Sequence, residues 1–193
     1  MADMFEAHPL EQFFETLKTP AGKGVSVQSI EKRAIIQVFA SKGKTATVER
    51  ALKIKQTPGR SSAPTGYAAI PVAPGQWMLV SDKADTNGKF ASDIKAKLKN
   101  NGYVSEQSDS RVIFRLTGPR VVELMQKGCR LDLHPSATGQ GWCAQTQMAQ
   151  MGVIIHQLDD KPSYDVMVYS GFARDFAEWV EHTAAQLGVS FKR

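Results

Sequence analysis

The sequence predicts an α+β fold in which antiparallel sheets carry packed helices. Two observations lead to this prediction: apolar runs of strand length follow one another in pairs, and the order strand, strand, helix, strand occurs twice. Strands that follow one another along a chain favour antiparallel sheets, with helices gathered on one face. A chain of 193 residues can hold one large domain or two small ones, and its core needs no disulfide or metal.

Seven apolar runs are predicted to be strands. The dipeptide Pro74-Gly75 separates two of them and is typical of a hairpin turn. Residues 55–64 are rich in proline, glycine and serine, and we expect a loop there. The predicted strands cover residues 34–39, 67–72, 76–81, 103–105, 111–117, 151–158 and 164–169.

Four segments are predicted to be helices: residues 10–18, residues 89–100, a segment from Gly118-Pro119 to Gly128, and a last helix after Ser170. Proline suits the first helical position because no hydrogen bond is lost there. Ser170 is a candidate N-cap, and Gly188 ends the last helix. The stripe that this helix is expected to bury consists of Phe172, Phe176, Trp179, Val180, Thr183 and Leu187.

The formal net charge of +5 is concentrated in the first third of the chain. Residues 18–60 contain ten basic residues and two acidic ones, whereas residues 1–17 contain four acidic residues and no basic one. Such a surface attracts an acidic partner surface or a polyanion. Nucleic acid is not expected, because Phe39 is the one aromatic residue there and belongs to a strand pattern. We expect residues 1–60 to form a basic N-terminal arm or extension beside a domain at residues 61–193.

This arm is predicted to dock on a partner subunit. The segment from residue 10 to 18 has apolar residues at the spacing of one helix face, and such a short helix must pack on something. Packing on its own domain is the alternative. Apolar side chains would supply affinity and lysines would steer an acidic surface. The expected partner-binding residues are Phe13, Phe14, Leu17, Lys42 and Lys44.

The sequence offers no catalytic, cofactor-binding or metal-binding motif. It lacks G-x-G-x-x-G, the phosphate-binding G-x-x-x-x-G-K-[ST] and G-x-S-x-G. Its four histidines do not have metal-ligand spacing, and Cys129 and Cys143 are expected to be reduced thiols. No apolar run approaches the ~20 residues of a membrane helix, and no signal peptide is recognisable, so a cytoplasmic protein without membrane contact is expected.

Asp132 is the carboxylate that stands out, because it lies between Leu131 and Leu133. Two interpretations are open. The side chain accepts hydrogen bonds from the loop backbone, as aspartates in turns commonly do. Alternatively, it is a binding-site carboxylate for an amine or a pterin-like ring.

Several short segments between about residue 66 and residue 189 follow one another in a distinctive order. The segments are Pro74-Gly75-Gln76-Trp77-Met78-Leu79-Val80, Ser108-Asp109-Ser110-Arg111, Leu116-Thr117-Gly118-Pro119, Gly128-Cys129-Arg130-Leu131-Asp132-Leu133, Gly141-Trp142-Cys143-Ala144-Gln145-Thr146, and Val168-Tyr169-Ser170-Gly171-Phe172-Ala173 with Trp179. No single segment is specific, whereas their order and spacing together are. In this order and spacing the chain resembles the gamma subunit of heterotetrameric sarcosine oxidase.

The resemblance implies an aminomethyltransferase-like, folate-binding type of fold and a role in sarcosine catabolism. The chain would be a non-catalytic structural subunit of an oxidoreductase complex that demethylates sarcosine or a related N-methyl amino acid, with tetrahydrofolate as one-carbon acceptor. Its partners would be the alpha, beta and delta subunits of a heterotetramer. FAD, FMN, NAD and zinc would be bound by those partner subunits, and this chain would hold no cofactor.

Three alternatives stay open from the sequence. The chain is a gamma-type subunit of an N-methylglutamate dehydrogenase, a stand-alone folate-binding or methyltransferase-like module, or a basic RNA-binding protein.

Overall fold

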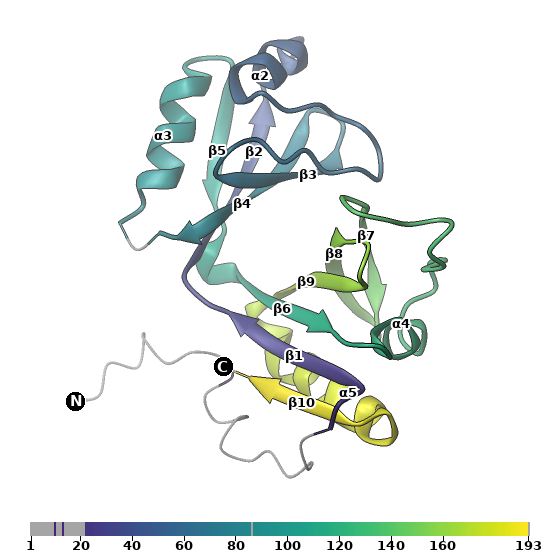
Figure 1. Cartoon of the computed structure of the whole chain (residues 1–193). Helices are drawn as coiled ribbons and strands as arrows, with labels where there is room; N and C mark the ends of the chain where they lie inside the picture. Colours follow the sequence, from purple (N-terminus) through teal and green to yellow (C-terminus); the bar gives the residue numbers. More distant parts are fainter. Residues whose placement is uncertain (1–9, 11–12, 14–21, 86, 193) are drawn as a thin grey trace, which may run out of the picture.

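The computed structural model describes residues 10, 13, 22–85 and 87–192, which form two sheets (Figure 1). The six-stranded sheet has the order β10-β1-β6-β9-β8-β7, and the four-stranded sheet has the order β3-β4-β2-β5. The six strands are β1 (Val25–Ile30), β6 (Arg111–Thr117), β7 (Cys143–Met148), β8 (Met151–Asp159), β9 (Ser163–Tyr169) and β10 (Val189–Lys192). The four strands are β2 (Arg33–Ala40), β3 (Tyr67–Ala73), β4 (Gln76–Ala84) and β5 (Gly102–Glu106).

All neighbouring strands pair antiparallel except β1 and β10, which are parallel. The helices are α2 (Thr45–Leu52), α3 (Lys89–Leu98), α4 (Val121–Gln126) and α5 (Ala173–Ala184). Short 3₁₀ turns lie at Ser108–Ser110, Ser170–Phe172 and Ala185–Leu187. The α+β prediction, with antiparallel sheets and packed helices, is confirmed.

The chain passes from one sheet to the other in two places, between β1 and β2 and between β5 and β6 (Figure 1). Strand β1 pairs with β6 in the six-stranded sheet, and β2 pairs with β5 in the four-stranded sheet. The segments β1–β2 and β5–β6 therefore run antiparallel to each other from one sheet into the other. At the crossing the Ile35 carbonyl accepts from the backbone N–H of Gln107 at 2.8 Å, and the Ile35 N–H donates to the Ser108 hydroxyl at 2.9 Å.

Successive side chains of a strand point to opposite faces of a sheet. The buried side chains therefore fall into three clusters, one on the outer face of each sheet and one between the sheets. The outer face of the six-stranded sheet packs against α4 and α5, and the outer face of the four-stranded sheet packs against α2 and α3. The inner faces meet in a third cluster, formed by Ile35, Ile70, Met78, Ile113, Cys143, Ile154 and Met167. The molecule is thus layered as helices, sheet, sheet, helices (Figure 1).

The seven predicted strands correspond to β2, β3, β4, β5, β6, β8 and β9, and the loop at residues 55–64 has no regular strand or helix. Helix α3 matches the prediction for residues 89–100. None of the seven predicted strands covers β1, β7 or β10, and α2 was not predicted either. Strand β10 has only four residues, and α2 has eight with two of them buried, so the local patterns are short.

Two predicted helix starts were wrong. Helix α4 begins at Val121, after Pro119 rather than at it. Ser170 opens a 3₁₀ turn, and α5 begins at Ala173 without a side-chain cap. As a consequence Phe172, expected in the buried stripe, is 49% exposed, while Phe176 and Val180 are buried as predicted.

The expected N-terminal arm is mostly part of the fold. Residues 25–30 form β1 inside the six-stranded sheet, and residues 33–40 form β2 inside the four-stranded sheet. The predicted helix at residues 10–18 lies outside the described residues except for Leu10 and Phe13. Both are buried in the core between the six-stranded sheet and α5, where the ring centroids of Phe13 and Phe191 are 5.2 Å apart. The division at residue 60 therefore does not separate the strands that build the two sheets.

Trp179 packs more shallowly than the sequence predicts. Its ring lies 5.7 Å from that of Phe176 and against the α-carbon of Gly128, where an added Cβ would sit 2.5 Å from the indole. We expect Trp179→Ala to lower the free energy of unfolding by about 2–3 kcal/mol, near or below the low end for a large aromatic, because the side chain is partly exposed.

Gly128→Ala should destabilise the wild type by about 1–3 kcal/mol, because the new methyl group collides with the indole. In the Trp179→Ala background the same substitution should cost clearly less, with a coupling energy above ~0.5 kcal/mol. Chemical denaturation of the four proteins checks this cycle. Additive effects would show that the indole does not rest on Gly128.

Candidate functional site

A cavity of about 190 Å³ lies between the inner faces of the two sheets. One wall comes from β2, β3 and β4, and the other comes from β6, β8 and β9, with Ile30 at the end of β1. Its apolar lining consists of Ile30, Ala68, Ile70, Val80, Ile113, Leu158 and Met167. Its polar lining consists of Arg33, Ser81, Asp82, Arg115, His156 and Asp165.

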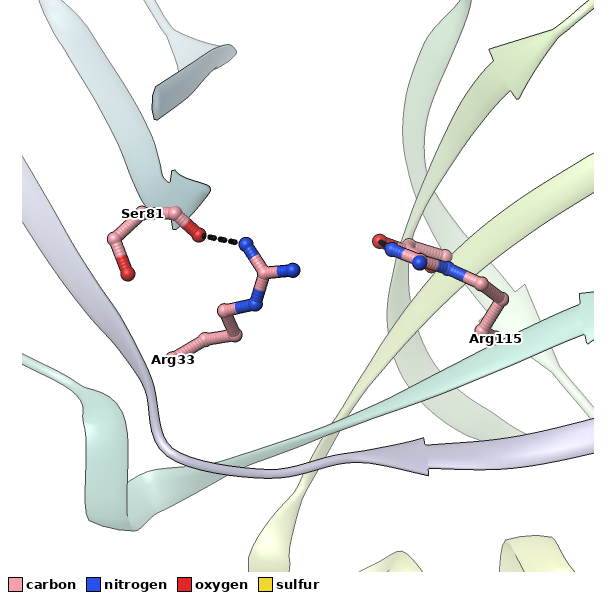
Figure 2. A network of polar contacts seen from close by, with 4 residues as sticks. Arg33, Ser81 and Arg115 are labelled. Atoms are coloured by element: carbon pink, nitrogen blue, oxygen red, sulfur yellow. Dashed lines mark hydrogen bonds and ion pairs between the residues drawn. The ribbon is translucent and has the colours of Figure 1, made fainter. Parts of the chain in front are cut away.

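Arg33 lies on the inner face of β2, as does Ile35 two residues later. The register of β2 and β4 shifts between these two residues. The Ser81 hydroxyl holds this irregularity by accepting from the Ala34 N–H at 2.9 Å and donating to the Lys83 carbonyl at 2.7 Å. The Ser81 carbonyl accepts from Nη1 of Arg33 at 2.7 Å, which fixes the direction of the guanidinium (Figure 2).

Arg115 and Asp165 form a bidentate ion pair on the opposite wall. Nε and Nη2 of Arg115 donate to the two carboxylate oxygens of Asp165 at 2.7 and 2.8 Å. The two residues are cross-strand partners on β6 and β9. The hydrogen bonds to Asp165 raise the pKa of Arg115, although burial opposes the shift. This geometry is the strong fork-to-fork type, and the buried carboxylate is fully compensated.

His156 completes the polar end of the cavity. Its Nε2 lies 2.9 Å from the Ser61 hydroxyl, which itself donates to the Gly141 carbonyl at 3.1 Å. The tautomer of the imidazole decides which of the two groups donates in this hydrogen bond. Burial lowers the pKa of His156; the nearby Asp165 opposes that shift and Arg115 adds to it. His156 is thus expected to be neutral at physiological pH.

Ser61, His156 and Asp165 combine the residue types of a hydrolase triad, but their hydrogen bonds do not match that chemistry. Both oxygens of Asp165 accept from Arg115, and within the described part of the chain no hydrogen bond joins Asp165 to His156. In a triad the carboxylate would instead accept from the imidazole and orient it. Asp165 therefore does not position His156 as the base of a triad.

The residues predicted to bind a partner are not gathered at this cavity. Lys42 and Lys44 are exposed in the turn between β2 and α2. Phe13 is buried in the chain's own core, and Phe14 and Leu17 lie outside the described residues. Their contact with a partner stays a prediction.

Asp132 and the cysteines have local roles. Oδ1 of Asp132 accepts from the His134 N–H at 2.9 Å in an exposed turn, as the first of the two interpretations expects. Cys129 and Cys143 are free and buried, and burial raises the pKa of Cys143 to about 11, so its thiol is unreactive.

Sequence reasoning missed all the charged residues of the cavity. A signal was available for two of them: Arg115 and Asp165 each interrupt an apolar strand at a position that faces away from the large core residues beside them. Their proximity depends on the pairing of β6 with β9, which no local pattern reveals.

Neither a metal site nor a membrane helix occurs in the described part of the chain. No group of three or more histidine, cysteine, aspartate or glutamate residues there could hold a metal ion. No helix there is both long enough and apolar enough to cross a bilayer.

Comparison with known proteins identifies a family. A family model described as "Sarcosine oxidase, gamma subunit family" matches residues 39–186. Sarcosine oxidase subunit gamma from Corynebacterium sp. strain P-1 is 24% identical over 116 residues, which cover 60% of this chain and 55% of that protein. The corresponding subunit from Arthrobacter sp. is 26% identical over 105 residues, covering 54% and 50%. The matched region thus spans about half the length of these relatives.

Two solved structures share the fold. A chain of the heterotetrameric sarcosine oxidase from Corynebacterium sp. U-96 has a TM-score of 0.80 at 18% identity, covering 98% of this chain and 100% of that chain. The glycine cleavage system aminomethyltransferase T from Bartonella henselae has a TM-score of 0.70 at 14% identity, covering 95% and 58%. The aminomethyltransferase-like fold implied by the sequence is confirmed.

The buried His156 should make stability depend on pH. Its pKa is lowered from the ordinary value of 6.5 in the folded chain, so the unfolded chain binds a proton more readily. The contribution of His156 to the free energy of unfolding is therefore complete above about pH 6.5. It is lost as the pH falls from there toward the pKa of the folded chain, with a slope of at most about 1.4 kcal/mol per pH unit.

His156→Gln should reduce the loss of unfolding free energy between about pH 7.5 and about pH 5.5. Urea denaturation at several pH values measures it, with His182→Gln at an exposed position as the matched control. An unchanged pH dependence in His156→Gln would mean that folding does not lower the pKa of His156.

Proposed function

Because the chain belongs to the sarcosine oxidase gamma subunit family, we propose that it is a structural, non-catalytic subunit of a heterotetrameric sarcosine oxidase-type complex. The observation that carries the proposal is the family match over residues 39–186. It is supported by the fold shared along 98% of this chain and all of a chain in the oxidase from Corynebacterium sp. U-96.

In this proposal the complex oxidatively demethylates sarcosine or a related N-methyl amino acid such as N-methylglutamate, and tetrahydrofolate accepts the one-carbon unit. The alpha, beta and delta subunits supply the FAD, FMN, NAD and zinc. The charges of the inter-sheet cavity agree with such a division of labour. Asp165 forms its hydrogen bonds with Arg115, and within the described residues none joins it to His156.

Co-expression with the three partner subunits tests the assignment. The chain should elute with them in size-exclusion chromatography, and flavin absorbance should follow the complex. The isolated chain should bind neither flavin nor tetrahydrofolate in equilibrium dialysis. Tetrahydrofolate binding by the isolated chain, without assembly, would favour a stand-alone folate-binding module instead.

The contact surface is proposed to include the exposed turn with Lys42 and Lys44. Reversing both charges with Lys42→Glu and Lys44→Glu should slow association with the partner subunits, on the order of tenfold at low salt, because charged rims steer encounter. The deficit should shrink as salt screens the charges.

Lys95→Glu with Lys97→Glu is the matched control, since these lysines are equally spaced and exposed on α3. Surface plasmon resonance at two salt concentrations gives both rates. If the two double variants associate equally fast, the turn is not part of the docking surface.

The apolar part of the proposed contact is Phe14 and Leu17, which share the apolar spacing of residues 10–18. Phe14→Ala should speed dissociation, because buried aromatic residues dominate interface energies. Phe13→Ala should instead lower the melting temperature of the isolated chain, since Phe13 is 2% exposed and packs on Phe191. Identical behaviour of the two variants would show that Phe14 belongs to the chain's own core.

A further inference from the structure

We propose that the inter-sheet cavity binds a small organic monocarboxylate between the guanidinium groups of Arg33 and Arg115. The two arginines come from facing sheets and line the same cavity. Figure 2 shows their guanidinium groups directed toward the same space from opposite sides. This binding site does not depend on the proposed function, because it is built entirely from residues of this chain.

Arg33 supplies an uncompensated positive charge. Its hydrogen bond is to the neutral carbonyl of Ser81, and among the described residues it forms no ion pair. Asp82, the carboxylate that lines the same wall, is exposed and therefore solvated. A guanidinium in a partly buried wall gains from an anionic partner, since the low local dielectric strengthens the attraction.

Arg115 supplies hydrogen-bond donors that Asp165 does not occupy. A guanidinium carries five N–H groups, and Asp165 accepts from Nε and Nη2. Within the described part of the chain, no hydrogen bond uses Nη1 of Arg115. A carboxylate placed between the two arginines would accept from Nη1 of Arg115 and from the free N–H groups of Arg33.

The charge balance of the lining favours one negative charge. Asp165 already neutralises Arg115, and His156 is neutral because burial lowers its pKa. The other two charges of the lining belong to Arg33 and Asp82, and Asp82 is exposed to solvent, so Arg33 is the charge on the partly buried walls that has no paired carboxylate. A dianion such as phosphate would leave a second charge uncompensated in a partly buried site, and that costs free energy.

The remaining lining selects for an apolar body of limited size. Most of the other lining side chains are aliphatic, so a ligand with a hydrocarbon part is desolvated favourably. The volume of about 190 Å³ is below the ~300 Å³ of the smallest drug-sized pockets. The ligand class is therefore a small carboxylate, for which propionate is a suitable probe.

Methyl NMR of the full chain, labelled at isoleucine, tests the site with propionate and its neutral isostere propionamide. Propionate should shift the methyl signals of Ile30, Ile70 and Ile113, which line the cavity. Ile36, buried on the other face of β2, should not move. Propionamide should bind at least tenfold more weakly. Equal binding of the two compounds, or no saturable shift with propionate, would overturn the proposal.

Arg33→Met removes the charge and keeps the length of the side chain. It should weaken propionate binding at least tenfold, whereas Arg130→Met, at an exposed position away from the cavity, should leave it unchanged. Melting temperatures of both variants control for folding. Should Arg33→Met fail to fold, the comparison of propionate with propionamide on the wild type still decides the question.

Discussion

The structure depends on one constraint: the segments β1–β2 and β5–β6 pass together from one sheet into the other, paired as β1 with β6 and as β2 with β5. The crossing forces the sheets face to face, and Lys32 adopts a left-handed backbone with φ 60° beside it. Because side chains alternate along each strand, consecutive residues face different layers of the molecule. In β6, Phe114 packs toward α5, whereas Arg115 faces the space between the sheets.

Local patterns in the sequence predicted most of the strands and the class of fold. They did not predict which strands pair or which side chains meet between the sheets. The apolar run around Phe114 is long enough to identify β6 without any knowledge of its neighbours. Strand β10 has four residues and exists because β1 pairs with it in parallel, so only the tertiary structure defines it. The charge-rich stretch before residue 60 reads as an arm by composition, yet its apolar alternation at residues 33–40 places β2 between β4 and β5.

In the candidate site, too, single residues can be recognised in the sequence, whereas their contacts depend on how the strands pair. Arg115 and Asp165 are visible in the sequence as single charges within apolar strands, but their ion pair requires the register of β6 with β9. Arg33 shares the inner face of β2 with Ile35, but no motif in the sequence indicates that Arg33 and Arg115 line one cavity. We propose that this chain is a structural subunit and that its partner subunits carry out the chemistry.

Native mass spectrometry of the complex, purified with its partner subunits, tests that central idea most directly. The account predicts an assembly of four different chains from which this chain, once released, carries no added mass of flavin, nucleotide or zinc. A released chain that retains one of these groups, or a chain found only as free monomer beside a complete partner complex, would contradict it.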